Sequence, residues 1–172
     1  LPYAMSESLL KLQIGPVQDF IAQARSTRDL WSGSYLLSWL MAHLIKDLTA
    51  ASKAVRIIYP ALADPGNPGR QLQPLVRYLR SNELPPGETA ATLRVPTLPN
   101  TLLAVVPGSW LSREVETHAV ASLHRTWAAE VQTCLEYYND VSRVPFTLPE
   151  TEHFRTQASR FWDVWWQLEP IV

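Results

Sequence analysis

The chain has 172 residues, of which 47% are hydrophobic and 18% charged, so it is long and apolar enough to fold around a core. Fifteen Lys and Arg against sixteen Asp and Glu give a formal net charge of −1, which excludes a chain-wide electrostatic attraction to nucleic acid or anionic membranes. A single cysteine excludes an internal disulfide and a cysteine-built metal site. Without a signal peptide or an apolar run of membrane-spanning length, we expect a cytoplasmic protein that makes no membrane contact.

The first part of the chain predicts a strand, two helices and a second strand. Residues 9–14 alternate between apolar and polar side chains and end at a Gly-Pro pair, which indicates a half-buried strand. Apolar residues at spacings of three and four then predict a helix from about residue 17 to 28. A stronger stripe over 37–48 predicts a second helix that begins near Ser32 or Ser34, and the β-branched run 55–59 predicts the second strand.

The second part begins with a change of composition. Residues 60–99 hold eight of the fourteen prolines and three of the six glycines, which predicts a long insertion with one short helix at about 72–79. The apolar and aromatic patterns that follow predict a strand, a helix of about seven turns, a polar helix and a last strand, at 102–106, 111–135, 150–159 and 161–168.

This order of elements predicts an α+β fold. It matches the βαββαβ plan of a ferredoxin-like sandwich, in which helices cover one face of a four-stranded sheet. The chain adds a helix pair after the first strand, the Pro-rich insertion at about 60–99, and an extra helix before the last strand. We expect residues 1–172 to form one such domain, and the opening Leu-Pro suggests a piece of a longer protein.

Motifs for catalysis are missing from the sequence. The four histidines do not have the spacing of a zinc site, and there is no nucleophile elbow or Walker loop. We therefore expect no catalytic residue and no metal site in this chain.

The best candidate site lies between the two predicted helices. Arg25 and Arg28 lie near the expected end of the first helix, and Ser32-Gly33-Ser34 would begin the second. Exposed N–H groups at a helix start, two hydroxyls and nearby guanidinium groups suit a phosphate. The alternative is that Ser-Gly-Ser is an ordinary helix start.

Three tryptophans gather in the predicted last strand. Alternation would place some of Trp162, Trp165 and Trp166 on the helix-covered face and others on the open face. Aromatic side chains on an open sheet suit either a protein contact or base stacking, although this strand lacks the Arg and Lys that RNA binding needs.

One long stretch resembles a known family. "IGPVQDFIAQARSTRDLWSGSYLLSWL", from Ile14 to Leu40, is similar to a signature of the large subunit of type III-B (Cmr) CRISPR effector complexes. "IIYP" at Ile57–Pro60 and "LPN" at Leu98–Asn100 are also similar to landmarks of that family. The family often has Asn-Arg-Phe where this chain has Asn100-Thr101-Leu102.

The resemblance implies a function for the chain as part of a larger protein. The family's large subunit carries an HD nuclease-like domain and two ferredoxin-like palms, and the second palm uses a Gly-Gly-Asp-Asp turn, a divalent metal (Mg or Mn) and ATP to make cyclic oligoadenylate. This chain contains neither the HD pair nor Gly-Gly-Asp-Asp, so it resembles the first, non-catalytic palm.

The expected partners follow from the same resemblance. They are the second palm of the same parent chain, ATP, other Cmr subunits and, indirectly, guide RNA and target RNA. The family's Gly-Ser-Tyr segment lies at the ATP cleft, which adds Tyr35 to the suspected nucleotide-binding set of Arg25, Arg28, Ser32, Gly33 and Ser34. The alternative function is a free-standing module that binds single-stranded RNA through the aromatic residues of the last strand.

Overall fold

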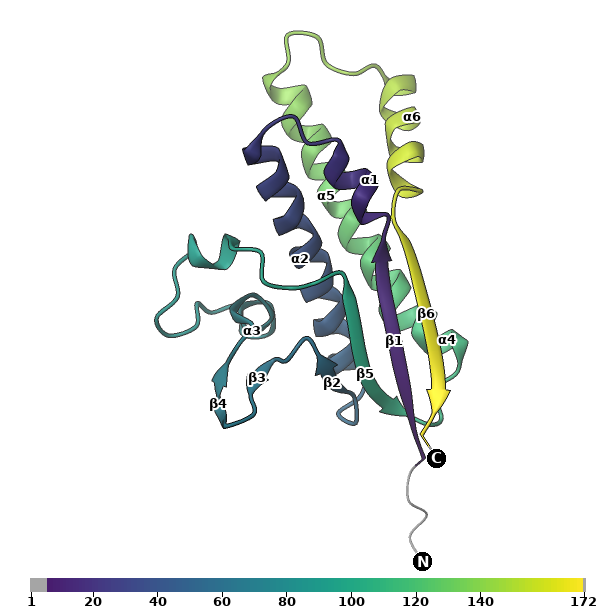
Figure 1. The fold of residues 1–172 in the computed structure, drawn as a ribbon. Coiled ribbons are helices and arrows are strands. Elements are labelled where there is room, and N and C mark those ends of the chain that lie inside the picture. The colour runs from purple at the N-terminus through teal and green to yellow at the C-terminus, as the bar shows by residue number, and fades with distance from the viewer. Residues whose placement is uncertain (1–5, 172) are drawn as a thin grey trace, which may run out of the picture.

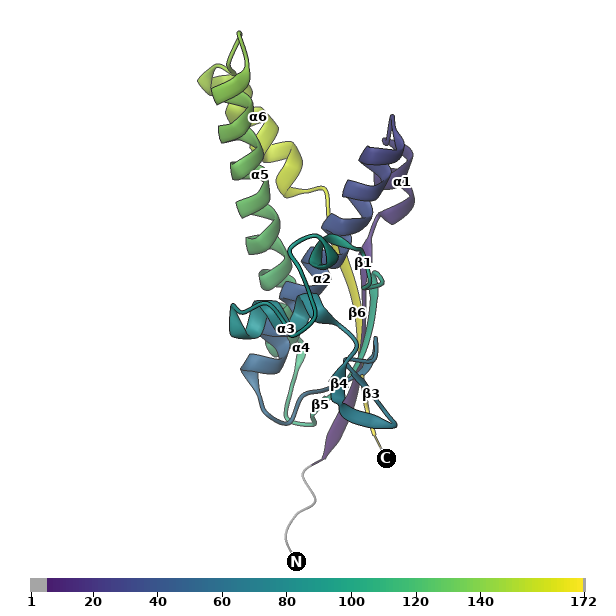
Figure 2. The ribbon, with the colours of Figure 1, turned by 90° about the vertical axis from the view of Figure 1, so that its left-hand side faces the viewer.

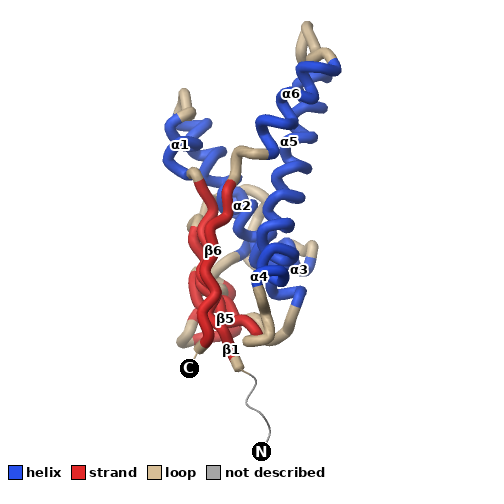
Figure 3. The backbone as a smooth tube through the Cα atoms, turned by 90° about the vertical axis from the view of Figure 1, so that its right-hand side faces the viewer, coloured by secondary structure: helices blue, strands red, loops and turns tan. Residues whose placement is uncertain are grey.

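A four-stranded antiparallel sheet forms one layer of the protein, and the helices lie against one of its faces (Figures 1 and 3). The computed structural model describes residues 6–171. The sheet consists of β1 (Glu7–Gly15), β2 (Arg56–Tyr59), β5 (Thr101–Pro107) and β6 (Asp163–Pro170) in the order β2-β5-β1-β6. Read from the β6 edge and counted along the chain, this is the fourth, first, third and second strand, the order of a ferredoxin-like fold, so the predicted fold class is confirmed.

The central strand β1 fixes the register of the sheet. It pairs with β5 from Glu7↔Pro107 to Gln13↔Thr101 on one side. On its other side, β1 pairs with β6 from Ser8↔Pro170 without interruption. Because side chains alternate along a strand, Leu10, Leu12 and Ile14 all point to the helix-covered face and are fully buried.

The helices cover that face and complete the core. They are α2 (Thr27–Ala51), α4 (Ser112–Val115) and α5 (Ala121–Val141). The helices α1 (Val17–Ala22) and α6 (Leu148–Ser159) have no buried residue and lie past the end of the sheet (Figure 1). A π-helical turn over Glu116–Val120 joins α4 to α5, so the predicted long helix is continuous but not uniformly α-helical. Leu40, Met41 and Leu44 of α2 are completely buried against the sheet.

The boundary between α1 and α2 differs from the prediction. The first helix ends at Ala22 rather than near residue 28, and the second begins at Thr27 rather than at Ser32 or Ser34. Ser26 caps α2, since its hydroxyl accepts a hydrogen bond from the Asp29 N–H at 3.2 Å. The segment 32–34 therefore lies inside a 25-residue helix, not at a helix start.

The predicted insertion contains more regular structure than its prolines and glycines suggest. Within it, β3 (Ala63–Asp64) and β4 (Asn67–Gln71) form a separate two-stranded ribbon. The short helix α3 (Pro74–Ser81) lies close to its predicted position and packs beside α2, and a 3₁₀ turn follows at Thr92–Arg94. These elements lie beside β2 at one end of the sheet (Figure 1).

Candidate functional site

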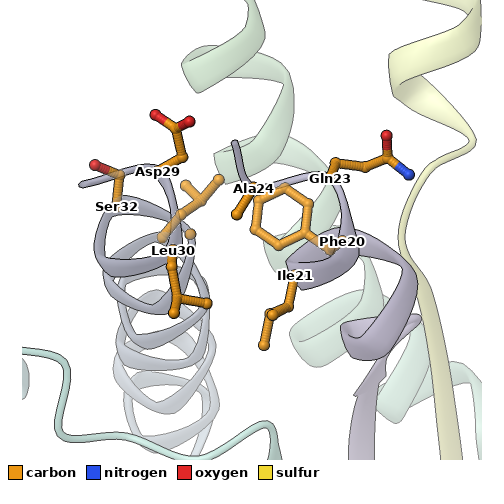
Figure 4. Close-up of a pocket in the computed structure, with 9 residues that line it drawn as sticks. Phe20, Ile21, Gln23, Ala24, Asp29, Leu30 and Ser32 are labelled. Carbon is orange, nitrogen blue, oxygen red and sulfur yellow. The ribbon is translucent and has the colours of Figure 1, made fainter. Parts of the chain in front are cut away.

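A cavity of about 320 Å³ lies between α1 and the first turns of α2. Phe20 from α1 and Leu30 from α2 point into the space between the two helices (Figure 4). The walls are mainly apolar, and the polar side chains lie at the rim. The full lining comprises Phe20, Ile21, Gln23, Ala24, Asp29, Leu30, Ser32, Gly33 and Leu36.

Gly33 sets the distance between the two helices at this cavity. A Cβ atom at position 33 would lie 3.1 Å from Cε1 of Phe20, which is tighter than ordinary van der Waals contact. Phe20 is held in turn, because its ring centroid lies 4.9 Å from that of the buried Trp162. The glycine in the middle of α2 thus permits close packing of α1 against α2 rather than breaking the helix.

The six candidate residues do not come together as predicted. Ser32 and Gly33 line the cavity, whereas Ser34 and Tyr35 are not among its lining residues. The Ser34 hydroxyl donates a hydrogen bond to the Leu30 carbonyl at 3.0 Å within the same helix. The predicted helix start at Ser32 or Ser34 is therefore wrong, because residues 32–34 lie inside α2 and have no free backbone N–H groups to offer. The assignment of these residues to nucleotide binding stays a prediction.

Charged residues lie at the observed start of α2, where the chain connects it to α1. The Asp29 carboxylate accepts a hydrogen bond from the Arg25 backbone N–H at 3.1 Å, which ties the connection to the helix. Arg25 and Arg28 are both exposed. Within residues 6–171, neither guanidinium group lies in an ion pair. Arg25 and Arg28 thus adjoin Ala24 and Asp29 in the chain, both of which line the cavity, but neither arginine is itself a lining residue.

Tyr35 belongs to a different surface of α2. Its ring stacks on Trp31 at a centroid distance of 6.2 Å and is followed by Trp39 one turn later. Burial raises the pKa of the Tyr35 hydroxyl above its usual range, although the positive charge of Arg94 opposes this shift. The Trp39 indole N–H donates to the Glu130 carboxylate of α5 at 2.9 Å, which anchors this aromatic row to the neighbouring helix.

The tryptophans near the last strand divide between the two faces, as alternation predicts. Trp162 lies just before β6 and is buried, and Trp166 is half-buried on the helix side, where its N–H donates to Glu116. Trp165 is 55% exposed on the open face. Its ring covers Gly15 of β1 so closely that a Cβ atom there would collide with it. One exposed indole is a small platform for stacking bases.

The part of the chain that the structure describes offers neither a metal site nor a membrane-spanning helix. There, no group of three or more His, Cys, Asp or Glu side chains is placed to hold a metal ion. In the same residues, no helix has the length and apolar character needed to cross a membrane.

Sequence reasoning missed the residues that form most of the cavity wall. The apolar spacing assigns Phe20 and Ala24 only to helix packing, and it gives Leu36, Gln23 and Asp29 no role. The usable signal was Gly33 in an otherwise helical stretch, since an interior glycine indicates close approach of another group. The identity of that group, the Phe20 ring, follows only from the angle between the helices.

The comparisons with known proteins agree on one family. The chain matches the family model for "CRISPR-associated protein Cmr2, N-terminal" over residues 9–132. It is 37% identical over 103 residues to the CRISPR system Cmr subunit Cmr2 of Pyrococcus furiosus, which covers 59% of this chain and 10% of that protein. The chain therefore spans about a tenth of the length of this relative.

A solved structure supports the fold. A chain of the type III-B Cmr-beta complex bound to cognate target RNA superposes with a TM-score of 0.58 and 16% identity, over 99% of this chain and 20% of that chain. The stretch Ile14–Leu40 lies inside the family match, so the resemblance predicted from it is confirmed. The chain belongs to the family of the N-terminal region of the CRISPR-associated protein Cmr2.

Proposed function

We propose that this chain is the non-catalytic palm domain of a type III-B effector large subunit and that it completes the ATP cleft of a neighbouring, catalytic palm. In this role it also docks other Cmr subunits in the cytoplasm and, through them, guide RNA and target RNA. The observation that carries the nucleotide part is the α1–α2 corner, where an apolar cavity opens beside two arginines that lack carboxylate partners.

The shape and lining of the cavity suit a nucleobase better than a phosphate. Its volume of about 320 Å³ is at the lower end of small-molecule sites, which are mostly apolar with a few polar groups at the rim. The Gln23 amide and the Ser32 hydroxyl point away from the space between the two helices, so contact with a base would be mainly through apolar side chains (Figure 4). The Asp29 carboxylate can accept from an amino or ribose hydroxyl group, but it repels phosphate.

The phosphate end of the nucleotide belongs outside the cavity. Arg25 and Arg28 are exposed and would make charge-assisted hydrogen bonds to phosphate oxygens. Magnesium or manganese needs several oxygen ligands, and within residues 6–171 Asp29 is the one carboxylate that lines this cavity. We therefore assign the metal ligands and the reacting phosphates to the neighbouring palm.

The test uses the complete large subunit, because the proposed cleft needs both palms. Substituting Arg25→Gln together with Arg28→Gln removes two positive charges from an exposed corner and leaves the core intact. We expect ATP affinity to fall about tenfold, since each partly exposed ionic contact contributes up to about 1 kcal/mol. Cyclic-oligoadenylate formation at limiting ATP should fall in parallel.

A matched control separates local from general charge effects. The pair Arg77→Gln and Arg143→Gln removes the same charge from exposed residues that do not line the cavity and should leave ATP affinity within twofold of the parent. An Arg25/Arg28 variant that binds ATP as tightly as the parent would contradict the nucleotide role. Separately, metal-dependent product from radiolabelled ATP and this chain alone would overturn the assignment of a non-catalytic domain.

A further inference from the structure

A second groove lies at the opposite end of the molecule, between α2, β2 and α3. It has a volume of about 550 Å³. Its floor is aliphatic, formed by Val55, Ile57 and Leu62, and two basic residues stand at its rim. We name it the β2–α3 groove, and its lining is Lys46, Thr49, Ala50, Val55, Ile57, Leu62 and Arg80.

The basic residues of the groove lack acidic partners. Arg80 donates one hydrogen bond to the Thr49 hydroxyl at 2.8 Å, and a guanidinium group has five N–H donors. Across residues 6–171, neither Lys46 nor Arg80 has a carboxylate oxygen within ion-pair distance. By contrast, the neighbouring Asp47 is neutralised by Arg125 of α5 at 3.1 Å.

The stretch of sequence that contributes the groove is rich in basic residues, although the whole chain is nearly neutral. Residues 46–94 contain seven Lys and Arg and four Asp and Glu, whereas the rest of the chain contains eight and twelve. The neutral net charge thus conceals two regions of opposite sign. Lys46 and Arg80, unpaired among residues 6–171, attract an acidic partner to the β2–α3 groove.

The edge of the sheet borders the same groove. Strand β2 pairs with β5 on one side only, and in the part of the chain that the structure describes no strand pairs with its outer side. The strand is short and is followed at once by Pro60, so it is guarded against uncontrolled pairing. Its outward N–H and C=O groups remain available to one extended segment.

We propose that the β2–α3 groove binds an extended segment of a partner protein, which adds as a strand to β2. In such a strand, alternate side chains point to the groove. One of them is aliphatic and packs on Val55 and Leu62, and the next on that face is Asp or Glu and pairs with Lys46 or Arg80. This binding surface is independent of the proposed nucleotide cleft.

The floor of the groove favours a peptide over RNA as the occupant. Single-stranded nucleic acid is bound by aromatic side chains that stack with bases, together with a positively charged track. The lining residues here include no aromatic ring, and the aliphatic floor suits a Val, Ile or Leu side chain. The open strand edge adds main-chain hydrogen bonds, which a peptide backbone provides and RNA does not.

The test titrates the isotope-labelled chain with the peptide acetyl-Ser-Val-Thr-Glu-Thr-Val-Thr-Glu-Ser-amide. We expect chemical-shift changes and slower amide exchange at Arg56–Tyr59, with further changes around Lys46 and Arg80. The charge-reversed pair Lys46→Glu and Arg80→Glu should lower the affinity for this peptide about tenfold, because two exposed ionic contacts are lost. The same variant should gain affinity for a peptide with Lys in place of Glu.

Controls make the outcome decisive. Lys53→Glu with Arg77→Glu changes the same charge on exposed residues that do not line the groove, and it should leave peptide affinity within twofold. Equal binding of the Glu and Lys peptides, or no change at β2 with millimolar Glu peptide, would overturn the proposal. Binding of a uridine hexanucleotide at Lys46 and Arg80 in place of the peptide would also overturn it.

Discussion

The two halves of α2 differ in their surroundings, although they form one uninterrupted helix. None of residues 27–36 is buried, whereas Leu37, Leu40 and Leu44 in the second half are buried in the core. The exposed half lies with α1 at the end of the sheet, and the buried half lies across it (Figure 2). The polar stretch in the exposed half is therefore helix that extends past the core. Apart from Gly33 against Phe20 and the partly buried Tyr35 and Leu36, its residues are free of packing constraints and available for binding.

The largest expected effect comes from a leucine in the buried half. Leu44→Ala should lower the free energy of unfolding by about 2–5 kcal/mol, because it leaves a cavity in a fully buried site. Leu30→Ala in the exposed half removes the same atoms from a side chain that is 43% exposed and should cost at most about 1 kcal/mol. Urea unfolding of the two variants measures the difference, and equal losses would contradict the division of α2.

Sequence patterns predicted the sheet well because burial acts on every second residue of a strand. The alternation of Leu10, Leu12 and Ile14 depends only on which face of β1 is covered, and that face is apolar along its whole length. The family signature within Ile14–Leu40 likewise predicted the family correctly. These signals are contained in neighbouring residues, so no three-dimensional information was needed to use them.

The helix boundary and the cavity could not be predicted in the same way. Ser26, Ser32 and Ser34 are all chemically able to cap a helix, and their local sequences do not rank them. A tertiary contact decides that Ser26 caps the helix. Residue 33 must already lie within the helix for Gly33 to face the Phe20 ring. The ribbon β3–β4 was missed because Asn67–Gln71 contains Pro and Gly, which are depleted in strands and tolerated at exposed edges.

Ser34 and Ser38 lie one turn apart in α2, and they test whether a single hydrogen bond contributes more to stability in the buried half than in the exposed half. In the buried half, the Ser38 hydroxyl bridges the Leu98 N–H and carbonyl, both at 3.2 Å. Ser38→Ala leaves two buried backbone groups without partners and should cost about 1–3 kcal/mol. Ser34→Ala loses only a bond to its own helix at Leu30 and should change stability by less than about 0.5 kcal/mol.

Thermal and urea unfolding of both serine variants provide the measurement. The wild-type chain is the reference, and the circular dichroism spectra of the variants should match it. If Ser34→Ala destabilises the chain as much as Ser38→Ala, the exposed half of α2 contributes more to global stability than its exposure indicates.

Removing the N-cap of α2 should lower the free energy of unfolding by less than the Leu44 and Ser38 substitutions do. Ser26→Ala removes the acceptor for the Asp29 N–H and should lower stability by about 1 kcal/mol or less, because the first turn frays without unfolding the core. Ser26→Asp keeps an acceptor and should restore stability. Hydrogen exchange should show the loss confined to the amides of the first turns of α2, whereas faster exchange around Leu44 would contradict this local effect.

The smallest expected effect is the contribution of His43, in the buried half of α2, to the pH dependence of stability. Burial of the His43 imidazole lowers its pKa, nearby Lys46 lowers it further, and Asp47 acts in the opposite direction. The unfolded chain, with an ordinary histidine pKa near 6.5, therefore binds the proton more readily than the folded chain. Stability from this group is fully present above about pH 6.5 and is lost as the pH falls toward the lowered folded-state pKa. His43→Gln should flatten the decline of Tm between about pH 7.5 and pH 5.5, and an unchanged slope would show that other groups cause it.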